Sequence, residues 1–306
     1  MPRRNWPTGL VDTHVHTAPD VIPRRLNDLE LARGADEAGY RALVLKSHHT
    51  ITAPRATIAQ EHTAETRIYG GVVLNLHATG GINPLAVETA LRLGARVVWL
   101  PTFTSANQVR YARRAGVKSD NLKALGAIEG GGVEVLDSDG GLRPEVVETL
   151  DLLAAHGATL ATGHVGAGEI MAVVPQAVAR RVPNVIITHP EHSVVGLSVE
   201  QQLELAELPN VWFERVLVVT LATSEGYPLG GIAENIRTVG VDSTIMATDL
   251  GQAANPHPIP GLQTYIDGLL DRGFSHDDVE RMACVNPSSA LDLDGLPTPP
   301  MPTENR

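Results

Sequence analysis

The sequence predicts an α/β protein with a single (β/α)8 TIM barrel domain. Three observations support this prediction. Eight apolar segments alternate with segments of helical pattern. The apolar segments are nearly continuous in hydrophobic residues, as strands covered on both faces are. The length of 306 residues suits one barrel. An open doubly wound sheet is the alternative, but its first strand usually leads into a glycine-rich turn, where residues 16–20 here read His-Thr-Ala-Pro-Asp.

Composition and charge exclude several classes of protein. The net charge of −11 argues against a general nucleic-acid binder. It says little about the small-molecule substrate that we expect, because a local pocket can differ in sign from the whole chain. Cys284 is the single cysteine, which rules out a disulfide within the chain and favours a packed thiol. No apolar run approaches 18 residues, and the first residues lack the pattern of a signal peptide. We therefore expect a cytoplasmic protein with no membrane contact, and a homo-oligomer, as is common for barrels.

The first half of the chain predicts four strands with helices between them. Asn27 or Asp28 suits the cap of the first helix, and Gly39 ends it. Pro84 stands at the favoured first position of a later helix. In order, the predicted elements are strand 10–16, helix 27–38, strand 41–49, helix 54–66, strand 68–76, helix 83–94 and strand 96–102.

The regular alternation is interrupted after the fourth strand. A short helix is predicted within 104–116, and residues 117–143 are rich in glycine. The segment 137–141, Asp-Ser-Asp-Gly-Gly, is typical of a hairpin turn. We interpret 117–143 as an insertion that forms a hairpin over one mouth of the barrel, where long ordered insertions often act as lids.

The second half resumes the alternation. Ser198 and Gln201 form the pattern of a capping box. The predicted elements are helix 144–156, strand 159–164, helix 168–181, strand 184–189, helix 198–208, strand 210–220, helix 231–239, strand 243–249 and helices 261–272 and 276–284. The barrel domain is assigned to 1–295, and the proline-rich tail 296–306 shows no periodicity.

Metal-binding residue types stand where the predicted strands end. His14 and His16 lie two residues apart and therefore on one face of the first strand. The carboxyl ends of all strands in a closed barrel meet at one mouth, and imidazole and carboxylate groups bind divalent metals. We therefore predict a metal site there. The candidates are His14, His16, Lys46, His48, His164, His189 and Asp249, from strands one, two, five, six and eight.

This arrangement resembles the amidohydrolase superfamily of metal-dependent hydrolases over about residues 9–290. That family carries His-x-His after strand one, a histidine after each of strands five and six, and an aspartate after strand eight. The strings at 11–16, 44–48 and 247–252 look like those of an uncharacterised amidohydrolase-like group, DUF6282. The resemblance implies the metal ligands His14, His16, His164, His189 and Asp249.

The chain departs from the family pattern at strand four. Binuclear members bridge two metals with a carboxylated lysine or a glutamate, commonly from that strand, but Trp99-Leu100-Pro101-Thr102 offers neither. Lys46 is a candidate for carboxylation and metal ligation, and Glu129 is a weaker one. If neither bridges, the site holds one ion. Zn²⁺ with an open coordination position is the expected metal, and one ion is favoured over two.

The resemblance implies hydrolysis of an amide, cyclic amide, ester or lactone by metal-activated water. Asp249 is expected to move the proton from water to the leaving group. His189 and His48 are expected to stabilise the carbonyl oxygen as charge develops. Lys46, where it binds no metal, is expected to pair with a carboxylate or bind the substrate at the reacting centre.

Residues of the surrounding loops complete the predicted site. Arg24 is predicted to bind a substrate carboxylate. The alternative is that Arg24 is a solvated loop residue with no contact to the substrate. Gln252 and Asn255 are predicted to line the pocket, although such amides often only hold turns. Glu191 and His192 are predicted to support the metal ligands from behind.

Two other reaction classes stay open. The same ligands on a single metal can perform decarboxylation or hydration. A phosphoesterase of the PHP type also begins with His-x-His and has a histidine after strand two, like His48. That family usually ends with Asp-x-His, whereas Asp249 is followed by Leu250 and Gly251. A non-catalytic sensor of a metal or small molecule is a further, more remote alternative.

Overall fold

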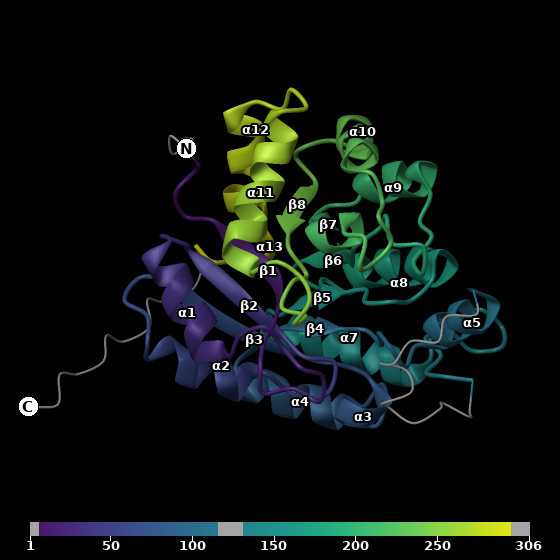
Figure 1. The fold of residues 1–306 in the computed structure, drawn as a ribbon. Helices are drawn as coiled ribbons and strands as arrows, with labels where there is room; N and C mark the ends of the chain where they lie inside the picture. The colour runs from purple at the N-terminus through teal and green to yellow at the C-terminus, as the bar shows by residue number, and fades with distance from the viewer. Residues whose placement is uncertain (1–5, 116–130, 295–306) are drawn as a thin grey trace, which may run out of the picture.

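The computed structural model describes residues 6–115 and 131–294 and confirms the predicted barrel. Eight parallel strands follow one another in chain order around the sheet, surrounded by helices (Figure 1). The first and last strands also join, because Asp249 N donates to His14 O and His16 N donates to Leu250 O, both at 2.8 Å. The strands are β1 (Val11–His16), β2 (Ala42–Lys46), β3 (Arg67–Val73), β4 (Ala95–Trp99), β5 (Thr159–Ala161), β6 (Val185–Thr188), β7 (Val211–Val216) and β8 (Thr244–Ala247).

The predicted helices occur in the predicted order, and two short helices, at 76–79 and 286–290, were not predicted. Caps explain where several of the helices begin. Asn27 caps α1 by accepting from Glu30 N at 2.9 Å, while Glu30 accepts from Asn27 N at 2.8 Å. Ser198 and Gln201 make the same reciprocal pair at α9. The helices are α1 (Asp28–Glu37), α2 (Ala53–Gln60), α3 (Leu76–Thr79), α4 (Pro84–Arg92), α5 (Ala106–Ala115), α7 (Pro144–His156), α8 (Ala167–Ala179), α9 (Val199–Ala206), α10 (Leu229–Val239), α11 (Pro258–Leu270), α12 (His276–Glu280) and α13 (Asn286–Ala290).

Several predicted elements end earlier than expected, among them the helix predicted over 54–66, which ends at Gln60, and the strand predicted over 68–76, which ends at Val73. Two others change into a different kind of helical turn. The strand predicted over 210–220 stops at Val216 and continues as a 3₁₀ turn, η1 (Leu217–Thr220), because Val218 N bonds to Thr248 O at 3.1 Å in the loop after β8. The helix predicted over 276–284 changes at residue 281 into a π-helical turn, η2 (Arg281–Val285). Pro287 follows it and has no amide hydrogen to continue the α-helical ladder.

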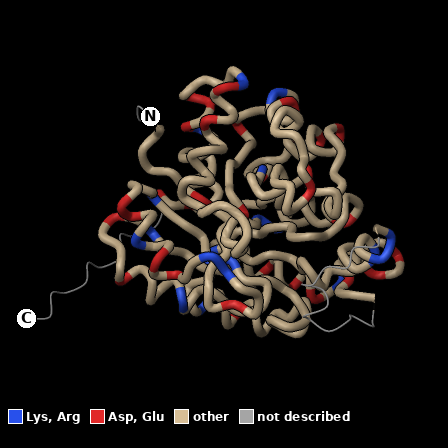
Figure 2. Tube along the Cα trace, viewed as in Figure 1, with Lys and Arg blue, Asp and Glu red and all other residues tan. Residues whose placement is uncertain are grey.

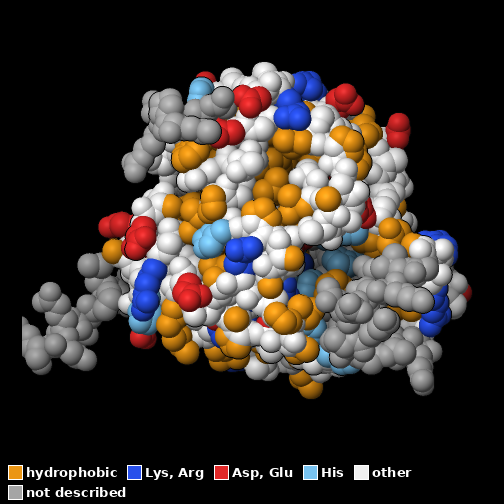
Figure 3. Space-filling view, in the orientation of Figure 1, with side chains coloured by type: hydrophobic (Ala, Val, Ile, Leu, Met, Phe, Trp, Pro, Cys, Tyr) orange, Lys and Arg blue, Asp and Glu red, His pale blue; other side chains and the backbone are white. Residues whose placement is uncertain are grey.

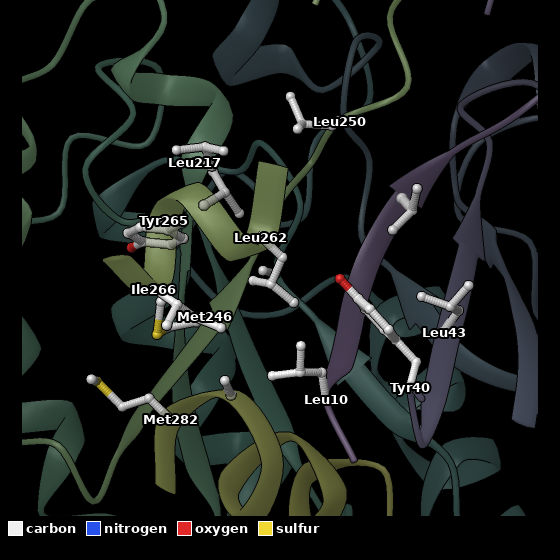
Figure 4. Packing of buried hydrophobic residues seen from close by; sticks show 14 of the residues in the cluster. Leu10, Tyr40, Leu43, Leu217, Met246, Leu250, Leu262, Tyr265, Ile266 and Met282 are labelled. Atoms are coloured by element: carbon white, nitrogen blue, oxygen red, sulfur yellow. The ribbon is translucent and has the colours of Figure 1, made fainter. Parts of the chain in front are cut away.

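Apolar side chains fill the barrel interior below the mouth at which the carboxyl ends of the strands meet. Val11, Val44, Val97 and Ile245 are fully buried there, and residues at the end of α13 pack against them from below. Trp99 forms the uppermost layer and is 1% exposed. A second cluster lies between the strands and the outer helices, where Figure 4 shows aliphatic and aromatic residues packed between β1, β2, β8 and α11. The mouth of the barrel therefore stands on a rigid apolar base.

Part of the predicted insertion is visible in the described residues. Leu136 pairs antiparallel with Leu142, and Asp137 N donates to Gly141 O at 2.8 Å across the predicted turn. Residues 116–130, which include Glu129, lie outside the described residues, as does the tail 295–306. Whether the insertion is a lid stays a prediction. Among the described residues, no helix has both the length and the apolar character needed to cross a bilayer.

Charged side chains lie mainly on the outer helices and loops (Figure 2). The exceptions on the barrel strands are Asp12, Lys46, Glu214 and Arg215, which are buried. Burying a charge is costly unless it is paired. These residues therefore mark the part of the barrel where the packing serves something other than stability.

Candidate metal centre

Three of the predicted ligands meet at the seam between β1 and the loop after β8. His16 Nε2 lies 3.0 Å from Asp249 Oδ1, and His14 Nε2 lies 3.2 Å from the same oxygen. Both histidine side chains are 1% exposed. Within the described residues these three form a group whose ligand atoms all lie within 4.8 Å of one another. The alternation of β1 produces this arrangement, because Val15 between the two histidines points into the outer core.

The other ring nitrogens fix how the two histidines present their lone pairs. His14 Nδ1 lies 2.9 Å from Glu214 Oε2, and His16 Nδ1 lies 3.0 Å from the carbonyl oxygen of Lys46. Both partners only accept hydrogen bonds, so each Nδ1 donates its proton. In the neutral ring, which is the form that binds a metal, each Nε2 then offers a lone pair. Two lone pairs and a carboxylate oxygen then converge on one point. That donor set fits a divalent cation such as Zn²⁺, whose histidine ligands are typically oriented in this way.

Glu214 belongs to the candidate site by its contacts and was not predicted from the sequence. It lies on β7, is 1% exposed, and accepts a hydrogen bond of 2.5 Å from Thr13 Oγ1 in addition to the one from His14. The sequence did contain a signal. Glu214 and Arg215 interrupt an apolar strand, Val-Trp-Phe-Glu-Arg-Val, and adjacent charges in a strand buried on both faces need partners.

Lys46 lies against the same cluster. Its Nζ is 2.9 Å from His14 Nε2 and 5.3 Å from the centre of the Trp99 ring. Burial lowers the pKa of Lys46 to about 8, although the carboxylates of Asp249 and Glu214 act to raise it. The ammonium group thus stands beside the position that a cation would take. Its carboxylation and its ligation of a metal stay predictions.

The ionisation states of His16 and Asp249 suit metal binding. Burial acts to lower the pKa of His14, but the carboxylates of Asp249 and Glu214 raise it overall, so a bound cation would compete with a proton on that ring. Burial lowers the pKa of His16 to about 3, with the charge of Arg24 acting in the same direction. Burial acts to raise the pKa of Asp249, but the charges and hydrogen bonds of His14 and His16 hold it well below its usual value. At neutral pH His16 is therefore a neutral imidazole and Asp249 a carboxylate, which are the forms that bind metal.

The remaining histidines line a pocket of about 180 Å³ above the cluster. His48 Nδ1 lies 2.8 Å from Thr102 Oγ1, and the His48 ring stacks on Phe103 with centroids 4.0 Å apart. His164 Nδ1 lies 2.8 Å from Gln108 Oε1. Burial lowers the pKa of each of these two histidines well below the usual value. The pocket is lined by His48, Phe103, His164, His189, His192, Val218, Thr223, Ser224, Asp249, Gln252 and Asn255.

His189 and Asp249 share an unusual backbone. Their φ angles are +33° and +51°, in the left-handed region that non-glycine residues rarely adopt. Such positions cost about 1–3 kcal/mol each and cluster at functional sites. His189 lies beside His164, with ring centroids 4.9 Å apart, and no described residue forms a hydrogen bond with its buried Nδ1. His164 and His189 are thus at the predicted mouth but outside the three-residue group, and their roles as ligands stay predictions. Histidine side chains are visible in a hollow of the face that Figure 3 shows.

The polar groups of the predicted substrate-binding residues already have partners within the protein, and these partners differ. Arg24 is paired with Asp20, its Nη2 lying 2.8 Å from Oδ2, and its side chain is 3% exposed. Asn255 Nδ2 donates to Gln252 Oε1 at 2.9 Å, and Gln252 Nε2 donates to Asp249 O at 2.8 Å. Gln252 and Asn255 therefore line the pocket while holding the turn after β8. Of the two residues predicted to support the metal ligands, Glu191 pairs with the buried Arg215, whereas His192 faces the pocket.

Comparison with known proteins agrees with the motifs. Residues 9–214 match the model of a family described as a family of unknown function, DUF6282. The chain belongs to the DUF6282 family. No curated protein matches its sequence. The matched segment contains four of the five metal ligands that the family resemblance implies, together with Lys46 and Glu214, while Asp249 lies beyond it.

Solved structures share the fold of this DUF6282 member at low sequence identity. An amidohydrolase from Pseudomonas aeruginosa is 15% identical, with a TM-score of 0.58, covering 93% of this chain and 95% of its own. An amidohydrolase from Burkholderia multivorans is 13% identical, with a TM-score of 0.56 and coverage of 95% and 100%. A 2,6-dihydroxybenzoate decarboxylase from Rhizobium is 13% identical, with a TM-score of 0.52 and coverage of 94% and 100%. The same barrel thus carries two kinds of reaction among its neighbours.

Proposed function

We propose that this DUF6282 member is a metal-dependent hydrolase that adds water to a small amide, cyclic amide, ester or lactone. The observation that carries the proposal is the convergence of His14 Nε2, His16 Nε2 and Asp249 Oδ1, with each histidine proton committed to an acceptor on the far side of its ring. A divalent ion, for which we favour Zn²⁺, supplies Lewis acidity and activates water when bound there.

The residues of the chain then have separate tasks. Asp249 is ionised and accepts the proton of the attacking water before passing it to the leaving group. His48 and His189 line the pocket next to Asp249 and stabilise the carbonyl oxygen of the substrate as charge develops on it. Lys46 contributes a positive charge beside His14. The pocket of about 180 Å³ limits the substrate to a small molecule.

Variants of Asp249 and of the two β1 histidines test the proposal. Asp249→Asn should retain most of the zinc but lower turnover of a panel of esters, lactones and amides roughly 100-fold or more, the usual size of a general-base contribution. Asp242→Asn, an exposed aspartate just before β8, is the matched control and should keep full activity. His14→Ala together with His16→Ala should remove zinc, measured by elemental analysis. Full turnover in Asp249→Asn would refute the role of the aspartate.

Decarboxylation is the second candidate. It is supported by the single compact ligand group in the described residues and by the decarboxylase among the structural neighbours. The two reactions differ in their products, because hydrolysis incorporates water whereas decarboxylation releases carbon dioxide without it. Reaction in ¹⁸O-labelled water separates them. Label in the product supports hydrolysis, and unlabelled product with carbon dioxide release supports decarboxylation.

A further inference from the structure

His192 is a pocket residue to which the proposed reaction assigns no task. It follows β6, and its ring lies one step further from the metal cluster than His189, with 5.1 Å between the two ring centroids. Its side chain is 23% exposed and forms part of the pocket wall. It therefore reaches the space where a substrate would extend away from the metal.

A carboxylate from another loop fixes the orientation of this ring. His192 Nδ1 lies 2.9 Å from Glu225 Oε1, in the loop between η1 and α10. Glu225 also accepts hydrogen bonds from Ser193 N, at 3.0 and 3.1 Å, and from the Ser193 hydroxyl. Tyr111 on α5 holds that hydroxyl at 2.5 Å. Three separate loops or helices thus converge to position one imidazole.

This arrangement determines which hydrogen-bonding group faces the pocket. A carboxylate oxygen at 2.9 Å requires the proton of the neutral ring to be on Nδ1. The amide of Val194 points at the same Nδ1 as a donor from 3.3 Å, a contact that would favour an unprotonated Nδ1. The carboxylate contact is shorter by 0.4 Å and charge-assisted, and we take it to decide the tautomer. Nε2 is then an acceptor, and within residues 6–115 and 131–294 it has no hydrogen-bond partner.

The other polar groups of the pocket wall are largely occupied. Thr223 Oγ1 donates to Asn255 Oδ1 at 2.6 Å, and Asn255 donates to Gln252. The Nε2 atom of His192 differs from these groups, because it is held in place without a partner. A ligand that supplies no donor would leave this acceptor unpaired and would bind less tightly.

We propose that His192, aligned by Glu225, recognises an N–H or O–H donor on the substrate through Nε2. The inference rests on the proposed function, since it places this contact beside the same metal site. It narrows the substrate class to compounds that carry a hydrogen-bond donor next to the group that reacts, such as cyclic amides or imides with a free N–H.

The tautomer of His192 provides the first test and needs no substrate. Nitrogen-15 NMR of the zinc-loaded chain should show the His192 proton on Nδ1. In Glu225→Ala the Nδ1 proton loses its acceptor, so the two tautomers should become mixed. A proton on Nε2 in the unmodified protein would overturn the proposal.

A matched pair of probes provides the second test. Glutarimide has a free N–H, and N-methylglutarimide lacks it. The zinc-loaded protein should bind glutarimide roughly threefold to tenfold more tightly, the usual worth of one neutral hydrogen bond. In His192→Phe and Glu225→Ala this ratio should fall towards one. Glu204→Ala, an exposed position on α9, should keep it.

The outcomes separate this inference from the proposed function. Equal binding of the probes, no binding of either, or an unchanged ratio in His192→Phe would contradict the recognition role. Zinc content measured in each variant excludes an indirect effect through the metal. Failure of the whole ester, lactone and amide panel would instead reject the hydrolase proposal, whatever the probe ratio shows.

Discussion

Glu214 offers the sharpest test of the metal centre, because it touches a ligand but not the metal position. Its carboxylate lies 2.9 Å from His14 Nδ1 and is 1% exposed, so water cannot replace it. Loss of such a supporting carboxylate typically weakens metal binding 10- to 100-fold, or about 1.4–2.7 kcal/mol. Glu214→Gln keeps an oxygen acceptor but loses the charge, so we expect zinc to bind about tenfold more weakly. Glu214→Ala leaves the His14 proton and the Thr13 hydroxyl unpaired, so we expect zinc to bind about 100-fold more weakly.

Zinc affinity measured by competition with a chromophoric chelator gives these values directly. Glu207→Gln, an exposed glutamate at the end of α9, is the matched control and should bind zinc as the unmodified chain does. We expect zinc affinity to be highest in the unmodified chain, lower in Glu214→Gln and lowest in Glu214→Ala. Equal affinity in all four proteins would show that Glu214 does not orient His14, and the argument from ring tautomers would then fail.

Three further predictions concern stability and reactivity. Gly251 has φ of +124°, and a Cβ there would lie 1.8 Å from His16 O, so Gly251→Ala should lower the free energy of unfolding by about 3 kcal/mol in urea titrations. Gly230→Ala, in open space on α10, should change it by less than about 1 kcal/mol. Burial acts to raise the pKa of Asp20, but the hydrogen bond from His49 and the charge of Arg24 hold it below its usual value. Its stabilisation is therefore present above about pH 4 and is lost as pH falls through the lowered pKa, so Asp20→Asn should flatten the acid side of a plot of urea midpoint against pH. Burial raises the pKa of Cys284 to about 12, so a disulfide reagent should label it only after unfolding, and rapid labelling of the native chain would contradict its packing.

The sequence predicted those parts of the molecule that depend on local pattern. The strand alternation around His14 and His16, a helix cap at Asn27, the capping pair at Ser198, and the order of eight strands are all present in the structure. Each depends on residues close together in the chain. The end of β7 was predicted too late because Val218 bonds to the loop after β8, a contact between distant segments.

The parts that could not be predicted depend on pairing between distant residues. Glu214 contacts His14 across 200 positions of sequence, and no local pattern indicates which buried acid will meet which histidine. Similarly, His192 was predicted only as a supporting residue, because its partner Glu225 comes from another loop. For Gln252 the sequence allows two roles, lining the pocket or holding a turn. The structure shows both, because Gln252 lines the pocket and bonds to Asp249 O.

The joint between β1 and β8 links chemistry to the order in which the chain is made. His14 and His16 emerge early during synthesis, while Asp249 and the strand that bonds to β1 emerge more than 200 residues later. Until β8 is in place, the two histidines lack their acid and β1 is an open edge. A nascent or truncated chain that stops before β8 would thus have neither a finished sheet nor a third ligand, so such fragments should be inert rather than partly active.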